Sequence, residues 1–469
     1  MSGLRRILTA TAAVATMAMA MPVQAETLSD ALVDAYRNSN LLEQNRALLA
    51  AADEDVAQAV SRLRPVISFA ANYLNRRTLL DESPTSAVVG RRSTVEQTTL
   101  DLALEMVLYD FGRTRTSIDL AKETVLATRA ALLSVEQQVL LEAVRAYVTY
   151  RLTQEILGFR QNYVSVIGEE LRATRDRFEV GEVTRTDVSL AESKLAGANA
   201  DVAAAEGDVR VAREAFRAAV GRYPGTLAPP PRSPKLPSTV QGAIDIAHRE
   251  NPAVIRQQHL VSAADLNIAL AEANMRPTIS AQGSLGTSSG AGDTVDYNAR
   301  SVGVSMSQVI YSGGLLSSQK RQAQMNREAQ RALLHETVLQ LEEDVGAAWA
   351  QLEVSSVQIA ANEAQIVAAR LAFEGLREEA KLGARTTLDV LDAEQDVLDA
   401  RAARAQSEAE RYFRVYQILA TMGRLTAEDL NLGIPTYDVT GYYNAVKKAP
   451  IGSWQGEQLD RVLKALGKN

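Results

Sequence analysis

Two acidic residues one helical turn apart are the side chains of this sequence that are best suited to a chemical role. Asp389 and Asp392 lie in an alanine- and leucine-rich segment, where a spacing of three residues places both carboxylates on one face of a helix. If copies of the chain met around an axis, the pairs would form rings of negative charge that attract cations and repel anions. The alternative is a solvated helix face without a function.

Other kinds of chemistry find little support in the sequence. It contains no cysteine, which excludes disulfides, thiolate metal sites and thiol nucleophiles. The three histidines, His248, His259 and His335, are too scattered to suggest a metal cluster or a catalytic triad. No nucleophile has a histidine beside it, and no phosphate-binding glycine loop occurs. We therefore expect no enzymatic activity, no metal and no cofactor.

The paired acids follow a glycine turn that occurs twice in the chain. Gly181 is followed by Thr184 and Asp187, and the same spacing begins again at Gly383. Glycine supplies the left-handed conformation that ends a helix, and a threonine three residues later can cap the next one. Each turn therefore predicts a compact helical hairpin.

These turns belong to a tandem duplication. The pattern from Ala31 to Pro65 recurs without gaps from Ala243 to Pro277, and the stretch that begins at Leu108 recurs in a second register. Such a repeat predicts the same order of elements in both copies. In the first copy, residues 26–222, we expect a helix at 28–63, strands at 66–76 and 97–108, a long helix at 113–180 and a return helix at 184–220. In the second copy, residues 239–424, we expect a helix at 239–275, strands at 278–286 and 298–310, a long helix at 315–382 and a return helix at 386–422.

The two long helices determine how the copies can pack. Each segment is free of proline, and at 1.5 Å per residue it would be about 100 Å long. A helix of that length cannot bury itself within a compact domain, so it must run along other helices as a coiled coil. The fold class that we expect is mainly α with a small β part, arranged as two tandem repeats of long coiled-coil hairpins.

The predicted strands alternate between a mainly apolar and a more polar set of residues, and only Gln308 breaks the apolar set. Such strands commonly cover a soluble core, but the rest of the chain offers no globular body for them. An apolar face opposite a polar face fits a transmembrane barrel with lipid outside and water inside. Four strands are fewer than the roughly eight of the smallest single-chain barrels, so three copies would share one barrel of twelve strands. The residues expected to face lipid are Leu100, Leu102, Leu104, Met106 and Leu108, together with Val302, Val304 and Met306.

The remaining segments concern export and connection. Residues 1–25 have the charged, apolar and small-residue order of a signal peptide, with cleavage expected after Ala25. No cysteine follows, so we expect no lipid anchor. The formal net charge of −7, which becomes more negative without the signal, argues against nucleic acid as a partner. Residues 223–238 form a proline-rich crossover between the copies, and residues 425–469 form a tail expected to join it in an equatorial belt.

With these features the sequence resembles the TolC-type outer-membrane efflux proteins over nearly the whole mature chain. The most specific part is the glycine turn of each copy, residues 177–188 and 381–393, and the junctions at 109–112 and 311–314 are similar to the family as well. The resemblance implies a homotrimer, with a twelve-stranded barrel in the lipid of the outer membrane and a helical tube in the periplasm. It implies a passive exit duct for tripartite efflux or type I secretion, partnered by a periplasmic adaptor (membrane fusion) protein and an inner-membrane pump of the RND, ABC or MFS type.

The resemblance also assigns roles to particular residues. Asp389 and Asp392 match acidic rings at the periplasmic aperture, while Arg385 matches a residue that ties the inner hairpin to acceptors at Thr186 and Asp187. The aromatic partner of that network falls at Ala380, which cannot form a hydrogen bond through its side chain. The expected adaptor-docking residues at the tips are Val180, Gly181, Thr184, Leu382, Gly383 and Thr386.

One alternative comes from a different class of protein. A periplasmic coiled-coil spacer or a filament subunit without a pore would explain the long helices. It would not explain the apolar alternation from Leu100 to Leu108.

Overall fold

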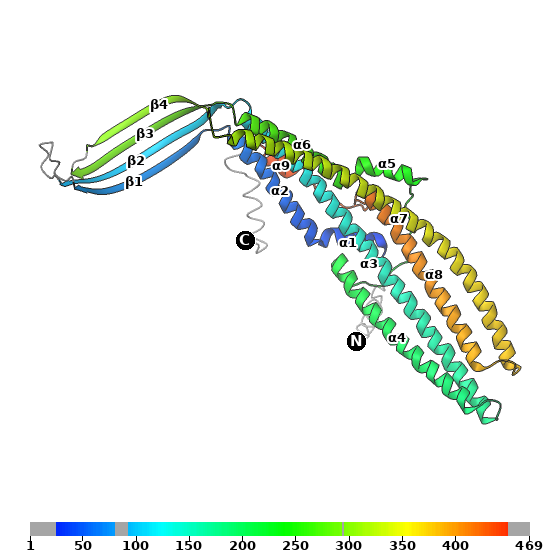
Figure 1. The fold of residues 1–469 in the computed structure, drawn as a ribbon. Helices are drawn as coiled ribbons and strands as arrows, with labels where there is room; N and C mark the ends of the chain where they lie inside the picture. The colour runs from blue at the N-terminus through cyan, green and yellow to red at the C-terminus, as the bar shows by residue number, and fades with distance from the viewer. Residues whose placement is uncertain (1–24, 80–91, 293–294, 449–469) are drawn as a thin grey trace, which may run out of the picture. The chain divides into compact units, whose positions relative to one another are not determined.

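The computed structural model describes residues 25–79, 92–292 and 295–448, and nearly all of the expected signal peptide 1–25 lies outside these ranges. The described chain forms two compact units, and each unit draws segments from both sequence copies. We call them the helical unit, residues 25–40, 136–243 and 344–434, and the sheet unit, residues 41–135, 244–343 and 435–448. Figure 1 labels the elements in chain order.

The long helices are α3, Arg113–Glu179, and α7, Leu315–Lys381, each of 67 residues. Their return helices are α4, Arg185–Val220, and α8, Thr387–Thr421. At the start of α3, the Asp110 carboxylate accepts a hydrogen bond from the backbone N–H of Thr114 at 2.7 Å. This bond satisfies one of the donors that the first turn of a helix leaves unpaired.

The helix expected to open each copy is in fact two helices. Residues 28–63 form α1, Leu28–Asn38, and α2, Asn40–Ser61, with Ser39 in an extended conformation between them. Residues 239–275 form α5, Val240–Glu250, and α6, Pro252–Ala273. Pro252 cannot donate to the preceding turn and holds Asn251 in an extended conformation, so Asn251 caps a new helix instead of continuing the old one. The expectation of a single helix in these segments was wrong.

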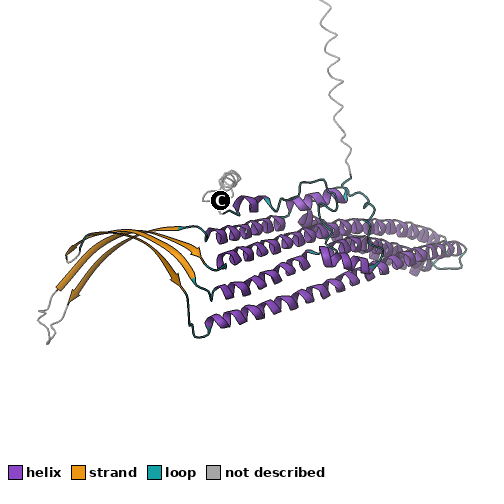
Figure 2. Cartoon of the chain, turned by 90° about the horizontal axis from the view of Figure 1, so that it is seen from above, coloured by secondary structure: helices purple, strands orange, loops and turns teal. Residues whose placement is uncertain are grey.

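The four strands form one antiparallel sheet in the order β1-β2-β3-β4 (Figure 1), and Figure 2 shows the strands in orange. Their bounds are Val66–Leu79 for β1, Arg92–Tyr109 for β2, Thr278–Gly292 for β3 and Tyr297–Ser307 for β4. Strands β1, β2 and β3 are longer than expected, whereas β4 ends before the expected limit of 310. The ladder between β3 and β4 ends at the pair Thr278 and Ser307, because Pro277 before β3 has no N–H to extend it.

The register of the sheet determines which side chains share a face. Leu102 pairs with Phe69 of β1 and with Leu285 of β3, and Val304 of β4 pairs with Ala281 of β3. Directly paired residues of neighbouring strands project from the same side. One face of the sheet is therefore mainly apolar, with Arg300 opposite Leu285, and carries this set: Ile67, Phe69, Leu100, Leu102, Leu104, Met106, Ile279, Leu285, Val302, Val304 and Met306.

A β-bulge interrupts the alternation where β2 approaches α3. The register shifts between Val107 and Tyr109, and Tyr109 pairs with Ile279 on the apolar face. The extra residue in the bulge is Leu108, which has no pairing partner in the ladder. The pairing therefore supports the predicted side for Leu100 through Met106 but does not fix it for Leu108.

The core of the helical unit contains a few large side chains among many alanines. Tyr147 of α3 and Phe216 of α4 are fully buried. The Tyr147 hydroxyl donates to the carbonyl of Ala228 at 2.8 Å, so the proline-rich crossover is fastened to α3. None of the described helices carries an uncharged apolar stretch long enough to span a bilayer.

The described part of the C-terminal tail packs within the sheet unit. It contains the short helix α9, Gly441–Val446. The Tyr442 hydroxyl donates to Glu54 of α2 at 2.7 Å, and the Arg129 guanidinium of α3 lies 5.1 Å from the ring centre of Tyr443. The tail thus covers a polar patch of α2 and α3 that includes the buried Asp53.

Candidate functional site

The two hairpin tips of the helical unit repeat one geometry. Gly181 and Gly383 have φ angles of 82° and 76°, the left-handed region that glycine adopts without strain. Thr184 caps α4 by accepting from the N–H of Asp187 at 3.3 Å, and the Asp187 carboxylate accepts from the N–H of Thr184 at 2.8 Å. Thr386 and Asp389 form the same reciprocal capping box at the start of α8.

The capping box gives each of these aspartates a structural role that we had not predicted. Their hydrogen bonds to the threonine lower the pKa of Asp187 and Asp389, so both carboxylates stay ionised well below neutral pH. The sequence did contain the signal, because a threonine followed three residues later by an acid is the pattern of a capping box. Asp389 can still present negative charge, because the cap leaves it partly exposed.

Asp392 has a different environment from Asp389. Its Oδ1 lies 2.7 Å from the Nζ of Lys194, which projects from α4 of the first copy. The two expected aperture acids are therefore on one helix as predicted, but within the chain one caps that helix and the other forms an ion pair with the opposite hairpin.

The residues expected to tie the hairpins do not bond to one another within the chain. The Arg385 Nε lies 2.9 Å from the Oε2 of Glu379, a residue of its own hairpin. Thr186 is exposed, and Asp187 forms its cap with Thr184. Asp187 and Arg385 nevertheless line one groove of about 500 Å³ between the tips, together with Ala380. Whether Arg385 reaches the neighbouring chain of an assembly stays a prediction.

The ends of the hairpins expose apolar side chains. Val180 is 71% exposed and Leu382 is 86% exposed, and they follow α3 and α7 at matching positions. Thr184 and Thr386, which were expected to contact an adaptor, are also exposed. Both apolar side chains are therefore accessible at the tips, which the predicted adaptor docking requires.

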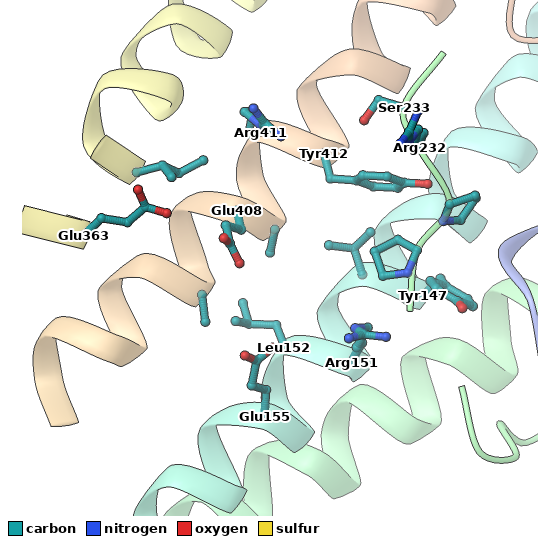
Figure 3. Close-up of a pocket in the computed structure, with 16 residues that line it drawn as sticks. Tyr147, Arg151, Leu152, Glu155, Arg232, Ser233, Glu363, Glu408, Arg411 and Tyr412 are labelled. Carbon is teal, nitrogen blue, oxygen red and sulfur yellow. The ribbon is translucent and has the colours of Figure 1, made fainter. Parts of the chain in front are cut away.

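A second groove of about 650 Å³ lies in the helical unit beside the proline-rich crossover. Figure 3 shows side chains from α3, α7, α8 and the proline-rich crossover around it. Both arginine and glutamate side chains line it, and Glu363 and Glu408 both form ion pairs with Arg404. The groove therefore carries both signs of charge. The described residues also contain no group of three or more acidic, histidine or cysteine side chains placed to hold a metal ion.

The apolar face of the sheet is open to the surroundings of the chain. Val302, Val304 and Met306 of β4 are 69% to 95% exposed, and Leu102 of β2 is 43% exposed. The opposite face pairs Ser280 with Ser305 and Ser284 with Ser301 across β3 and β4. Two tandem helical hairpins and a sheet with one apolar and one polar face are the parts that a membrane channel built from repeats requires.

Sequence comparison identifies the family, and it does so twice within the chain. The profile described as "Outer membrane efflux protein" matches residues 31–222 and, separately, residues 243–424. The chain is 35% identical to the outer membrane efflux protein BepC of Brucella suis biovar 1 (strain 1330) over 425 residues, covering 90% of this chain and 91% of that protein. It is 25% identical to the outer membrane protein TolC of Vibrio cholerae serotype O1 over 430 residues, covering 89% and 95%.

Comparison with solved structures finds the same fold. The outer-membrane channel OprN superposes with a TM-score of 0.73 at 23% identity, covering 84% of this chain and 89% of that chain. This chain belongs to the outer membrane efflux protein family. It is an exit duct of the outer membrane with a periplasmic extension, and its two copies match the family one after the other. The family members are channel proteins rather than enzymes.

Proposed function

We propose that three copies of this chain close their sheets into a shared barrel of twelve strands. Within the described residues, β1 pairs only with β2, and β4 pairs only with β3, so the sheet has two unpaired edges. Unpaired backbone groups cannot remain exposed in hydrocarbon, and closure with neighbouring sheets would satisfy them. The observation that carries this proposal is the combination of two open edges with an apolar face that crosses all four strands.

The hairpins of the three copies would continue the barrel as a periplasmic tube that narrows at the tips. In this proposal a periplasmic adaptor docks on Val180, Leu382 and the glycine turns beside them, and an inner-membrane pump supplies the energy. The exposed apolar tips support adaptor docking. The pump would be of the RND, ABC or MFS type, and the cargo would be small compounds or a secreted polypeptide.

The aperture would derive its charge from Asp389. A trimer would repeat this residue three times around the axis, and its lowered pKa keeps each carboxylate charged. Fixed negative charge at a narrow mouth favours cations over anions. Asp392, the other expected ring residue, would contribute less because Lys194 lies beside it.

Ion permeability of the purified protein in planar lipid bilayers tests this function. We expect a cation-selective conductance that loses most of its selectivity in the variant Asp389→Asn. Glu374→Gln is the matched control, because it removes an exposed carboxylate that forms an ion pair with Arg370 on the same helix. Equal selectivity in all three proteins would refute the aperture assignment.

The structural alternative makes a different experimental prediction. A spacer or filament subunit without a pore would give no conductance, and it would fractionate away from the outer membrane. Threefold symmetry of detergent-solubilised particles supports the duct, whereas monomers or fibres would contradict it.

A further inference from the structure

A row of ion pairs joins the first-copy hairpin to the return helix of the second copy. Lys194 of α4 lies 2.7 Å from Asp392 of α8. Arg160 of α3 lies between two carboxylates, 3.4 Å from Asp201 of α4 and 3.6 Å from Asp399 of α8. The row therefore connects α3, α4 and α8 within the helical unit.

The spacing of these charges matches the geometry of a coiled coil. Lys194 and Asp201 are seven residues apart on α4, as are Asp392 and Asp399 on α8. Seven residues make about two helical turns, so each pair of charges returns to the same side of its helix. The ion pairs thus form a continuous flank along the contact between the hairpins.

The flank borders an apolar seam between the same helices. Buried side chains of α3, α4 and α8 form one cluster, in which the alanines of α4 meet larger residues of α3 and α8. Because alanine buries little apolar area, the seam is held less tightly than a leucine-rich coiled coil. The cluster consists of Tyr163, Ile167, Leu171, Ala191, Ala198, Leu391 and Leu398.

A second link joins the hairpins nearer the tips. Glu170 of α3 lies 3.8 Å from the guanidinium of Arg377 on α7 and 4.0 Å from that of Arg177 on its own helix. The Glu170 side chain is only 17% exposed, so water screens this link less than the others.

We propose that the pairs Lys194–Asp392 and Arg160–Asp399 are the ties that hold the two hairpins of a chain together when the tip is closed. Like the tie expected of Thr186, Asp187 and Arg385, they join a first-copy hairpin to a second-copy hairpin, but they do so within one chain. Asp392 is then a gating residue that acts through its ion pair, and the free charge of the aperture comes from Asp389. This inference rests on the proposed channel function.

The ties should respond to salt. The side chain of Lys194 is 34% exposed and that of Asp392 is 55% exposed, so water and ions reach the pair. An exposed ion pair of this kind contributes little free energy alone. Because the apolar seam beside it includes small alanine contacts, the ion pairs would contribute a larger fraction of the free energy that keeps the tip closed. Salt at about 1 M reduces the screening length to about 3 Å and should favour the open state.

Charge exchange in the purified protein tests the ties. We expect Lys194→Gln and Asp392→Asn each to raise the open fraction several-fold in bilayers at 0.1 M KCl. The exchange Lys194→Asp with Asp392→Lys should return it close to the wild-type value. Arg370→Gln is the control, since Arg370 pairs with Glu374 along one helix and should leave gating unchanged.

Thiol cross-linking gives a readout that does not require a pore. The chain has no native cysteine, and Ser193 of α4 and Gln395 of α8 line one small groove between the hairpins. The yield of cross-linking between Ser193→Cys and Gln395→Cys should fall with Lys194→Gln and recover in the charge exchange. No change in yield, or a charge exchange that only adds the two single effects, would overturn the ties. If the wild type cross-links as expected but conducts no ions, the proposed channel fails and the ties stand.

Discussion

Removal of Arg222 should destabilise the helical unit far more than removal of a neighbouring surface arginine. Its guanidinium lies 2.7 Å from Asp34 and donates two hydrogen bonds to Glu26, at 2.9 Å and 2.7 Å. The Glu26 side chain is only 9% exposed, and the N–H of Gly225 also donates to it. Arg222 thus fastens the start of the described chain and α1 to the beginning of the crossover.

The magnitude follows from how deeply each partner is buried. Removal of one partner of a fully buried ion pair costs about 3 to 5 kcal/mol, because the other charge is left without compensation. Arg222 itself is 40% exposed, so water can enter beside Glu26 in the variant Arg222→Gln, and the cost falls to about 2 kcal/mol. This energy corresponds to a factor of about 30 in an equilibrium constant.

The assay is the rate of thermal unfolding in detergent, followed by circular dichroism at fixed protein concentration. If the clamp breaks before the transition state, Arg222→Gln unfolds up to about 30-fold faster than the wild type. The matched control is Arg217→Gln, which breaks an exposed pair with Glu214 and a contact with the Tyr223 ring, and should therefore have a much smaller effect. A second substitution, Glu26→Gln, should restore part of the loss by removing the orphaned charge.

Equal unfolding rates for Arg222→Gln and Arg217→Gln would refute this reasoning. They would mean that Glu26 is rehydrated at no cost, in spite of its burial. Failure of Glu26→Gln to restore stability would show that the lost hydrogen bonds, rather than the orphaned charge, dominate the effect.

Three further predictions concern other parts of the chain. Burial raises the pKa of Asp53 to about 6, although the nearby Arg129 opposes the shift. The protonated Asp53 therefore stabilises the fold fully below about pH 4, and this stability is lost as the pH rises through 6. The variant Asp53→Asn should slow unfolding at pH 7.5 but not at pH 4. Thr386→Ala should cost about 1 kcal/mol by removing the cap of α8 without removing the charge of Asp389, so it should lower the melting temperature while selectivity persists. Leu102→Arg should cost about 2 to 4 kcal/mol at mid-bilayer and reduce the outer-membrane amount on immunoblots, whereas Ala103→Arg on the opposite face should not.

Local patterns in the sequence predicted the main elements well. The glycine turns, the two long helices and the apolar face of the strands depend on residues close together in the chain, and the tandem repeat showed each of them twice. The break at Asn251–Pro252 was also readable, because proline constrains the residue before it. The break at Ser39 had a weaker signal, a run of residues that compete with the helical backbone for hydrogen bonds.

The partners of the charged side chains could not be predicted in this way. Lys194 and Asp392 are 198 residues apart, and their contact depends on how one hairpin is shifted along the other. The amino-acid composition does not determine how far one hairpin is shifted along the other, because alanine-rich faces allow several such shifts. The resemblance supplied a tether at Arg385, whereas within the chain Arg385 bonds to Glu379 of its own hairpin.

The tandem repeat indicates where a charge-sensitive opening would occur. When Gly181 is aligned with Gly383, Asp392 corresponds to Leu190 and Lys194 corresponds to Asp396. The repeat-related equivalent of the Lys194–Asp392 ion pair would therefore be Asp396 with Leu190, which cannot form an ion pair.

Arg160 is likewise replaced by Asn362 in the second copy, and its partner Asp399 corresponds to Gly197 in the first. In a trimeric tube, seams within a chain would alternate with seams between chains, and only the seams within a chain would carry these ties. Salt should therefore loosen alternate seams, and the tip should open with threefold rather than sixfold symmetry.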